Sequence, residues 1–131
     1  MHLKIITHDK VVFDGDVDEI YTKGVDGEFG ILKNHIPIIS ALDIGATKLV
    51  QSDKCRYFVT IGGVFQFKDN EATILTDVAE AGEDIDVTRA KAAKERAEAR
   101  LADKTANVDT KRAECSLARA LERLKVAQFS K

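Results

Sequence analysis

Glycine and proline are confined to the first two thirds of the chain. All eight glycines lie at or before Gly82, and the single proline is Pro37. The segment from Val87 to Lys131 contains neither residue and is rich in Ala, Lys, Arg, Glu and Leu. Because glycine and proline interrupt helices while these residues favour them, the C-terminal part is predicted to be helical. We therefore divide the chain into residues 1–84 and 85–131.

The N-terminal part consists of short alternating runs that are separated by turn residues. The clearest run is Cys55–Ile61, in which Tyr, Val and Ile alternate with Arg, Phe and Thr. Gly62-Gly63 ends this run, and Asp14-Gly15 and Asp69-Asn70 mark other turns. Strands this short and this closely spaced predict an antiparallel β-sandwich or a flattened barrel.

The C-terminal part carries two apolar stripes at helical spacing. They are Ala90, Ala93, Ala97 and Leu101 in the first segment and Ala113, Leu117, Leu121 and Leu124 in the second. Asp86 is predicted to be the N-cap of the first helix, and residues 103–107 the turn between the helices. Because a seam of alanine buries little apolar area, at about 25 cal/mol per Å², the helix pair should be weakly held and able to move. The expected fold class is α+β: an N-terminal antiparallel β-sandwich followed by a C-terminal two-helix hairpin.

Composition argues against several classes of protein. The 20 basic and 22 acidic residues give a net charge of −2, which does not indicate a nucleic-acid surface. The apolar runs are too short to span a bilayer and no signal peptide opens the chain, so no direct lipid insertion is expected. Cys55 and Cys115 lie in different parts and are expected to be free thiols.

The sequence lacks the signatures of catalysis and of metal binding. It has no phosphate-binding loop and no serine in a nucleophile elbow. His2, His8 and His35 are scattered without the spacing of metal ligands. We therefore expect neither an enzyme nor a metal site.

The segment Gly24–Pro37 has the pattern of a shaped loop. It holds three glycines in seven residues, then a short apolar run, and then Asn34-His35 ahead of the proline. One interpretation is a solvated turn whose histidine caps or packs. The other is a docking surface, on which Glu28 and His35 contact a partner.

Arginines of the two predicted helices form the second candidate site. Arg119 and Arg123 are four residues apart and share a helical face, as do Arg89 and Arg96, seven apart. If the helices fold back antiparallel, these guanidinium groups converge near Asp86, and arginine forks match the oxygens of a polyphosphate. The alternative is a solvated charged face, with compensation from Glu95, Glu98 and Glu122.

Several separated motifs, in the right order, resemble the epsilon subunit of the F-type ATP synthase. They are Phe13-Asp14-Gly15, the segment Gly24–Pro37, Gly62-Gly63 before an aromatic residue, Thr73–Asp77 with Ala79-Glu80, and Ile85–Ala90. The chain departs from the family at Lys33, where relatives usually carry proline. This departure concerns the stiffness of the loop more than the assignment.

The resemblance implies a role for each candidate residue. Certain bacterial epsilon subunits bind ATP through an Ile/Leu-Asp-x-x-Arg-Ala motif and arginines of both helices. The matching set here is Glu80, Ile85, Asp86, Arg89, Ala90, Arg96, Arg119 and Arg123. ATP would be a regulatory ligand, held without a bound metal. In the family, the residue matching Glu28 faces the membrane ring and the one matching His35 lies beside the gamma subunit.

The function that the resemblance implies is that of a non-catalytic central-stalk (rotor) subunit of a bacterial ATP synthase. It would couple proton or sodium flow to ATP synthesis, and would lie peripherally on the cytoplasmic face of the plasma membrane. Its partners would be the gamma subunit, the membrane c-ring and, when the hairpin extends to inhibit ATP hydrolysis, the α/β catalytic head. A free-standing ATP-sensing regulatory protein is the main alternative. An enzyme of phosphoryl transfer is a weaker one, because the sequence lacks a metal-binding carboxylate pair and a base.

Overall fold

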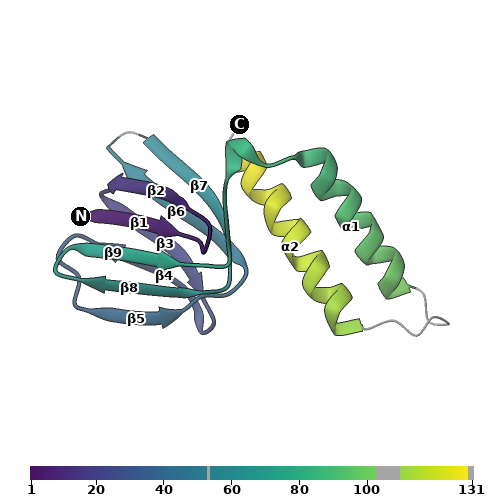
Figure 1. Cartoon of the computed structure of the whole chain (residues 1–131), viewed down its shortest axis with the longest axis horizontal. Coiled ribbons are helices and arrows are strands. Elements are labelled where there is room, and N and C mark those ends of the chain that lie inside the picture. The colour runs from purple at the N-terminus through teal and green to yellow at the C-terminus, as the bar shows by residue number, and fades with distance from the viewer. Residues whose placement is uncertain (53, 103–109, 130–131) are drawn as a thin grey trace.

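The computed structural model describes residues 1–52, 54–102 and 110–129, which form a β-sandwich with a pair of helices beside it (Figure 1). The first sheet has the strand order β2 (Val11–Asp16), β1 (His2–Ile6), β9 (Glu71–Leu75), β8 (Val64–Lys68), β5 (Ile38–Ala41). The second has the order β10 (Val78–Ala81), β7 (Lys54–Ile61), β6 (Gly45–Gln51), β3 (Glu19–Gly24), β4 (Gly27–Leu32). The predicted fold class is confirmed.

The pairing of β1 with β9 is a feature that the sequence did not predict. It is parallel, with Leu3 opposite Ala72 and Ile5 opposite Ile74, whereas the other pairs of named strands are antiparallel. Alternation of side chains indicates which face of a strand is buried but carries no information on which strand lies beside it. The chain leaves the first sheet after β2 and returns to it at β5 and again at β8, so distant strands become neighbours.

The core lies between the two sheets and is built from the inward side chains of both. Its fully buried members include Leu3, Ile5, Ile20, Ile31, Leu49, Phe58, Phe65, Phe67 and Ile74. One polar row crosses the inner face of the second sheet. The Thr47 hydroxyl lies 2.8 Å from the Thr22 hydroxyl and 3.0 Å from that of Thr60, so these buried groups satisfy one another.

The predicted turn at Gly62-Gly63 carries the chain from the second sheet to the first. Both glycines have positive φ, 70° and 106°. A Cβ atom at Gly63 would lie 2.0 Å from the carbonyl oxygen of Leu75, so this position admits no side chain. The Thr76 hydroxyl lies 2.7 Å from the Gly62 carbonyl oxygen and fixes the turn.

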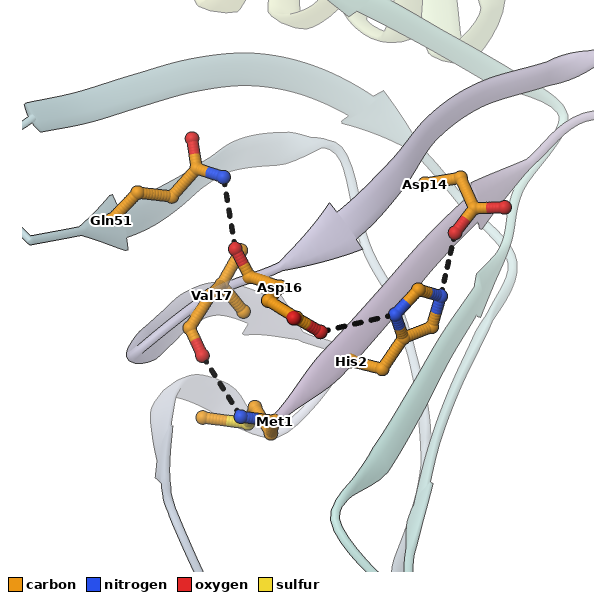
Figure 2. Close-up of polar contacts among 6 residues, drawn as sticks. All are labelled: Met1, His2, Asp14, Asp16, Val17 and Gln51. Carbon is orange, nitrogen blue, oxygen red and sulfur yellow. Dashed lines mark hydrogen bonds and ion pairs between the residues drawn. The ribbon is translucent and has the colours of Figure 1, made fainter.

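The N-terminus is attached to the sandwich by polar contacts. Figure 2 shows the Met1 ammonium group donating to the Val17 carbonyl at 3.1 Å, and the His2 ring between the carboxylates of Asp14 and Asp16. The Gln51 amide donates to the Asp16 carbonyl at 2.9 Å (Figure 2). These contacts join β1, the β2–β3 connection and β6 at one end of the sandwich.

A short 3-10 turn, η1 (Gly82–Asp84), leads from β10 into α1 (Val87–Ala102), and α2 (Thr110–Phe129) returns beside α1. The backbone N–H of Arg89 donates to Oδ1 of Asp86 at 3.0 Å, which confirms the predicted N-cap. The turn predicted at residues 103–107 lies outside the described residues. Cys55 on β7 and Cys115 on α2 are exposed free thiols, as expected.

The seam between the helices is mostly alanine. In α1 the predicted stripe is confirmed at Ala90 and Ala97, which are buried. In α2 the prediction of Leu121 was wrong, since 44% of this residue is exposed. The buried residues of α2 are Ala113, Ala120, Val126 and Ala127. Small side chains let the two helices approach closely, and the leucines at their margins remain partly exposed.

Among the described residues of α2, those of its last turns rest on the sandwich. Val126 and Ala127 pack in a small apolar cluster with Val59, Ile61 and Ile85, and the Phe129 ring lies 5.3 Å from that of Tyr57. Figure 1 shows α2 between the sandwich and α1. The hairpin is therefore attached where the last turns of α2 and the start of α1 meet the sandwich.

Candidate functional site

A cleft of about 450 Å³ lies where β10, η1, the start of α1 and the end of α2 meet. Its lining residues are Glu80, Asp84, Ile85, Asp86, Arg89, Ala90, Ala93, Arg96 and Arg123. We call it the arginine cleft. It lies between the two parts of the chain, so its shape depends on how the helices rest on the sandwich.

The start of α1 places its side chains on one wall of the arginine cleft. Ile85 is buried against the end of α2, which fixes the point where α1 begins. Asp86 then caps the helix, and Arg89, Ala93 and Arg96 follow at spacings of four and three residues. Residues at these spacings share a helical face. The small side chain of Ala93 leaves room between the two arginines.

An ion pair spans the arginine cleft from the opposite helix. Nε and Nη2 of Arg123 lie 3.2 Å and 3.1 Å from Oε1 of Glu80. The two side chains are 27% and 36% exposed, so water screens the pair only in part. This contact ties the end of α2 to β10.

The charges that line the arginine cleft are balanced. Arg89, Arg96 and Arg123 face the carboxylates of Glu80, Asp84 and Asp86. A polyphosphate entering here would therefore meet carboxylates, one of which, Glu80, already pairs with Arg123.

The structure brings together every residue of the predicted ATP-binding set except Arg119. This arginine lies on α2 one turn before Arg123, is exposed, and does not line the cleft. Asp84 and Ala93 line the cleft but were not in the predicted set. Ala93 was recognisable from its helical spacing to Arg89 and Arg96, whereas the place of Asp84 depends on the 3-10 turn, which no sequence pattern predicted.

The predicted docking loop consists of a strand and a turn. Glu28 is the second residue of β4, is exposed, and lies directly opposite Lys23 of β3. His35 follows the other end of β4, three residues after Leu32. The two candidate residues therefore lie at opposite ends of one strand and belong to two surfaces.

The turn that holds His35 is fixed to the sandwich. Asn34 has a φ of 65° and its side chain pairs with that of Asn70 at 2.9 Å. Nδ1 of His35 lies 2.6 Å from the Ile36 carbonyl oxygen, and its ring packs edge-on against Phe67 with centroids 6.0 Å apart. The histidine thus packs, as the first interpretation has it, and the next residue, Ile36, is 74% exposed.

An apolar row crosses the outer face of the first sheet. Ladder partners connect Ala41 to Val64, Val64 to Leu75, Leu75 to Ile6 and Ile6 to Val11. Val64, Leu75 and Val11 are 42%, 53% and 54% exposed. Ile39, on the same face of β5, is 72% exposed. A contiguous exposed patch of this kind is typical of a protein–protein interface.

In the described part of the chain, neither helix has the length and the apolar composition needed to cross a membrane. No group of three or more histidine, cysteine, aspartate or glutamate side chains in that part is arranged to hold a metal ion.

Two family models together match almost the whole chain. Residues 1–82 match the β-sandwich domain of the ATP synthase delta/epsilon chain, and residues 83–128 match its long α-helix domain. The chain is 45% identical over 128 residues to the ATP synthase epsilon chain of Halalkalibacterium halodurans, covering 97% of this chain and 96% of the relative. It is 40% identical over 128 residues to that of Bacillus licheniformis, covering 98% of each.

Solved structures share the fold. A chain in the Euglena gracilis mitochondrial ATP synthase superposes with a TM-score of 0.82 at 24% identity, over 96% of this chain and 79% of that one. A chain in the central stalk and c-ring of the Tetrahymena thermophila mitochondrial enzyme gives 0.62 at 13% identity, over 96% and 95%. At these identities the likeness concerns the fold alone. With both domains matched in order and close relatives over its full length, the chain belongs to the ATP synthase delta/epsilon chain family.

Proposed function

We propose that the chain is a non-catalytic rotor subunit of a bacterial ATP synthase, whose sandwich docks on the stalk and whose helices regulate ATP hydrolysis. Family membership over both domains supports the first half of this proposal. The observation that carries the second half is the Arg123–Glu80 pair, which closes a cleft lined by arginines between the helices and the sandwich.

The apolar row is the surface that we assign to the gamma subunit. It is rigid, because its side chains stand on a sheet whose opposite face is the core. His35 precedes β5, the edge strand of the first sheet, and is close in sequence to the exposed residues Ile36 and Ile39. Glu28, at the far end of β4, is then free to face the polar loops of the c-ring. Docking on both would couple the flow of protons or sodium ions to rotation.

The hairpin would regulate hydrolysis by moving between two positions. Lying on the sandwich, as in Figure 1, it would leave the enzyme active. Extended along gamma to the α/β catalytic head, it would inhibit ATP hydrolysis. The alanine seam and the small area of attachment support such a movement, because little apolar surface has to be exposed.

ATP would stabilise the position on the sandwich. Its phosphates would draw Arg123 away from Glu80 and join it to Arg89 and Arg96, with charge-assisted hydrogen bonds worth about 1.5–3 kcal/mol each. Since these arginines come from both helices, the nucleotide binds only where the helices lie together. A shift from 1:99 to 99:1 in favour of that state needs about 5.5 kcal/mol of differential binding. Two or three such contacts would supply it.

The site of action would be the cytoplasmic face of the plasma membrane, where the subunit lies peripherally as part of the complex. Relatives that are 40–45% identical to the chain come from bacteria, which supports this location.

Co-purification tests the stalk assignment. A tagged chain expressed with the ATP synthase subunits of a close relative should bring down gamma and the c-ring. Substitution of Val64 and Leu75 by serine should abolish this capture, while the matched pair Gln66→Ser and Thr73→Ser on the same face should not. A chain that binds ATP but captures neither partner would instead be a free-standing nucleotide sensor.

A further inference from the structure

A second cleft, of about 340 Å³, lies between the outer face of the second sheet and the last turns of α2. Ladder partners set Tyr21, Lys48 and Tyr57 side by side across this face. Phe129 of α2 covers the row, with its ring centroid 5.3 Å from that of Tyr57. The aromatic rings therefore come from both parts of the chain, and we call this space the aromatic cleft.

The charges of the aromatic cleft favour an anion. Lys48 and Lys125 line it from opposite sides, one from β6 and one from α2, against the single carboxylate of Glu28. The ammonium group of Lys48 lies 5.8 Å from the centroid of the Tyr21 ring, and that of Lys125 lies 5.8 Å from the centroid of Phe129. Each ammonium group thus lies over an aromatic ring that lines the cleft, where an acidic group attached to a bound ring could pair with it.

We propose that the aromatic cleft binds a planar aromatic anion, of the class of arene carboxylates. Its ring would lie against Tyr57 and Phe129, and its acidic group would pair with Lys48 and Lys125. The volume falls within the roughly 300–1,000 Å³ of small-molecule sites, and such sites combine apolar walls with a few polar groups as this one does. Stacking on tyrosine and phenylalanine favours a flat ring over an aliphatic chain.

Occupation of the aromatic cleft would hold the helices on the sandwich. Lys125 and Phe129 belong to α2, whereas the remaining walls belong to the second sheet, so the site exists only while the two parts are in contact. By mass action, any ligand that requires this contact stabilises it. The aromatic cleft and the arginine cleft share no lining residue, so this site does not rest on the nucleotide proposal.

The experiment is a titration of the full chain with 2-naphthoate in the absence of nucleotide, followed by backbone amide NMR. We expect saturable shifts at Lys48, Tyr57 and Phe129 with a dissociation constant of about 1 mM, the range for a ligand of this size. Lys48→Ala and Lys125→Ala should each weaken binding about fivefold, since each removes one partly exposed ion pair. Glu28→Gln should strengthen it about twofold by removing the repelling carboxylate.

Matched controls make the result specific. Lys68→Ala on β8 and Lys111→Ala on α2 remove exposed lysines that do not line the aromatic cleft, and both should leave the affinity unchanged. The neutral analogue 2-naphthamide should bind at least about fivefold more weakly than 2-naphthoate. Three results would each overturn the proposal: no saturation, shifts confined to the apolar row, or equal affinity for the acid and the amide.

Discussion

Arg123 of α2 pairs with Glu80 of β10, and its replacement by alanine should reduce the affinity for ATP at least tenfold. In the structure its guanidinium group makes two contacts with Oε1 of Glu80. Two charge-assisted bonds to phosphate in their place are worth about 3 kcal/mol or more. Breaking the partly exposed pair with Glu80 offsets this by up to about 1 kcal/mol. The net loss in Arg123→Ala is then about 2 kcal/mol, and each 1.4 kcal/mol is a factor of about ten.

Calorimetric titration with ATP measures this loss directly. The titration should be run in EDTA as well as in magnesium, because we expect the nucleotide to bind without a metal. Arg100→Ala is the matched control: it removes an exposed arginine of α1 that does not line the arginine cleft. Binding of ATP by Arg123→Ala within about threefold of the wild-type chain, or an equal loss in Arg100→Ala, would refute a role of Arg123 in holding the nucleotide.

Three other predictions concern stability, docking and pH. Thr47→Val leaves the buried Thr22 hydroxyl without its partner and should cost about 1–3 kcal/mol of unfolding free energy in urea melts. Thr73→Val, on the outer face of β9, should change it by less than about 0.5 kcal/mol, and equal effects would refute the role of the threonine row. Glu28→Ala should weaken binding to the c-ring, and His35→Ala binding to gamma, as measured by pull-down; since Glu28 is exposed, its substitution should leave the melting temperature of the isolated chain unchanged. The backbone N–H of Glu83 and then the Arg56 guanidinium, 2.9 Å away, lower the pKa of the Glu83 carboxyl below its ordinary value of 4.5. A lowered pKa stabilises the folded state above pH 4.5, and this contribution is lost as the pH falls through the pKa of the folded protein. The stability difference between wild type and Arg56→Met should therefore shrink on acidification from about pH 6 to about pH 3, and a constant difference would show that the pair has no such linkage.

Local signals in the sequence were sufficient for the strand at Cys55–Ile61, for the turn after it and for the start of α1. Alternation in Cys55–Ile61 and the positive φ required at Gly62-Gly63 predict a strand and the turn that follows it, because both depend on neighbouring residues only. The N-cap at Asp86 is of the same kind, as one carboxylate satisfies the N–H three residues later.

Features that depend on distant partners were not predictable in the same way. Leu121 lies on the periodic apolar face of α2 but is exposed, because α1 and the sandwich contact other sides of this helix. The parallel pairing of β1 with β9 depends on the path of the whole chain. For the arginine cleft, spacing predicted which arginines share a helical face. Spacing could not predict that Asp84 lines the cleft and Arg119 does not, because this follows from how η1 and α2 pack.

Closure of the hairpin on the sandwich by ATP can be followed at two natural labelling sites of the chain. Cys55 on β7 and Cys115 on α2 are both exposed free thiols, one on each part. Fluorescence transfer between dyes on these cysteines should increase as ATP rises to about 1 mM in the wild-type chain, and should stay constant in Arg123→Ala. Unchanged transfer in the wild-type chain at saturating ATP would contradict the account, and would leave the arginines as a solvated charged face.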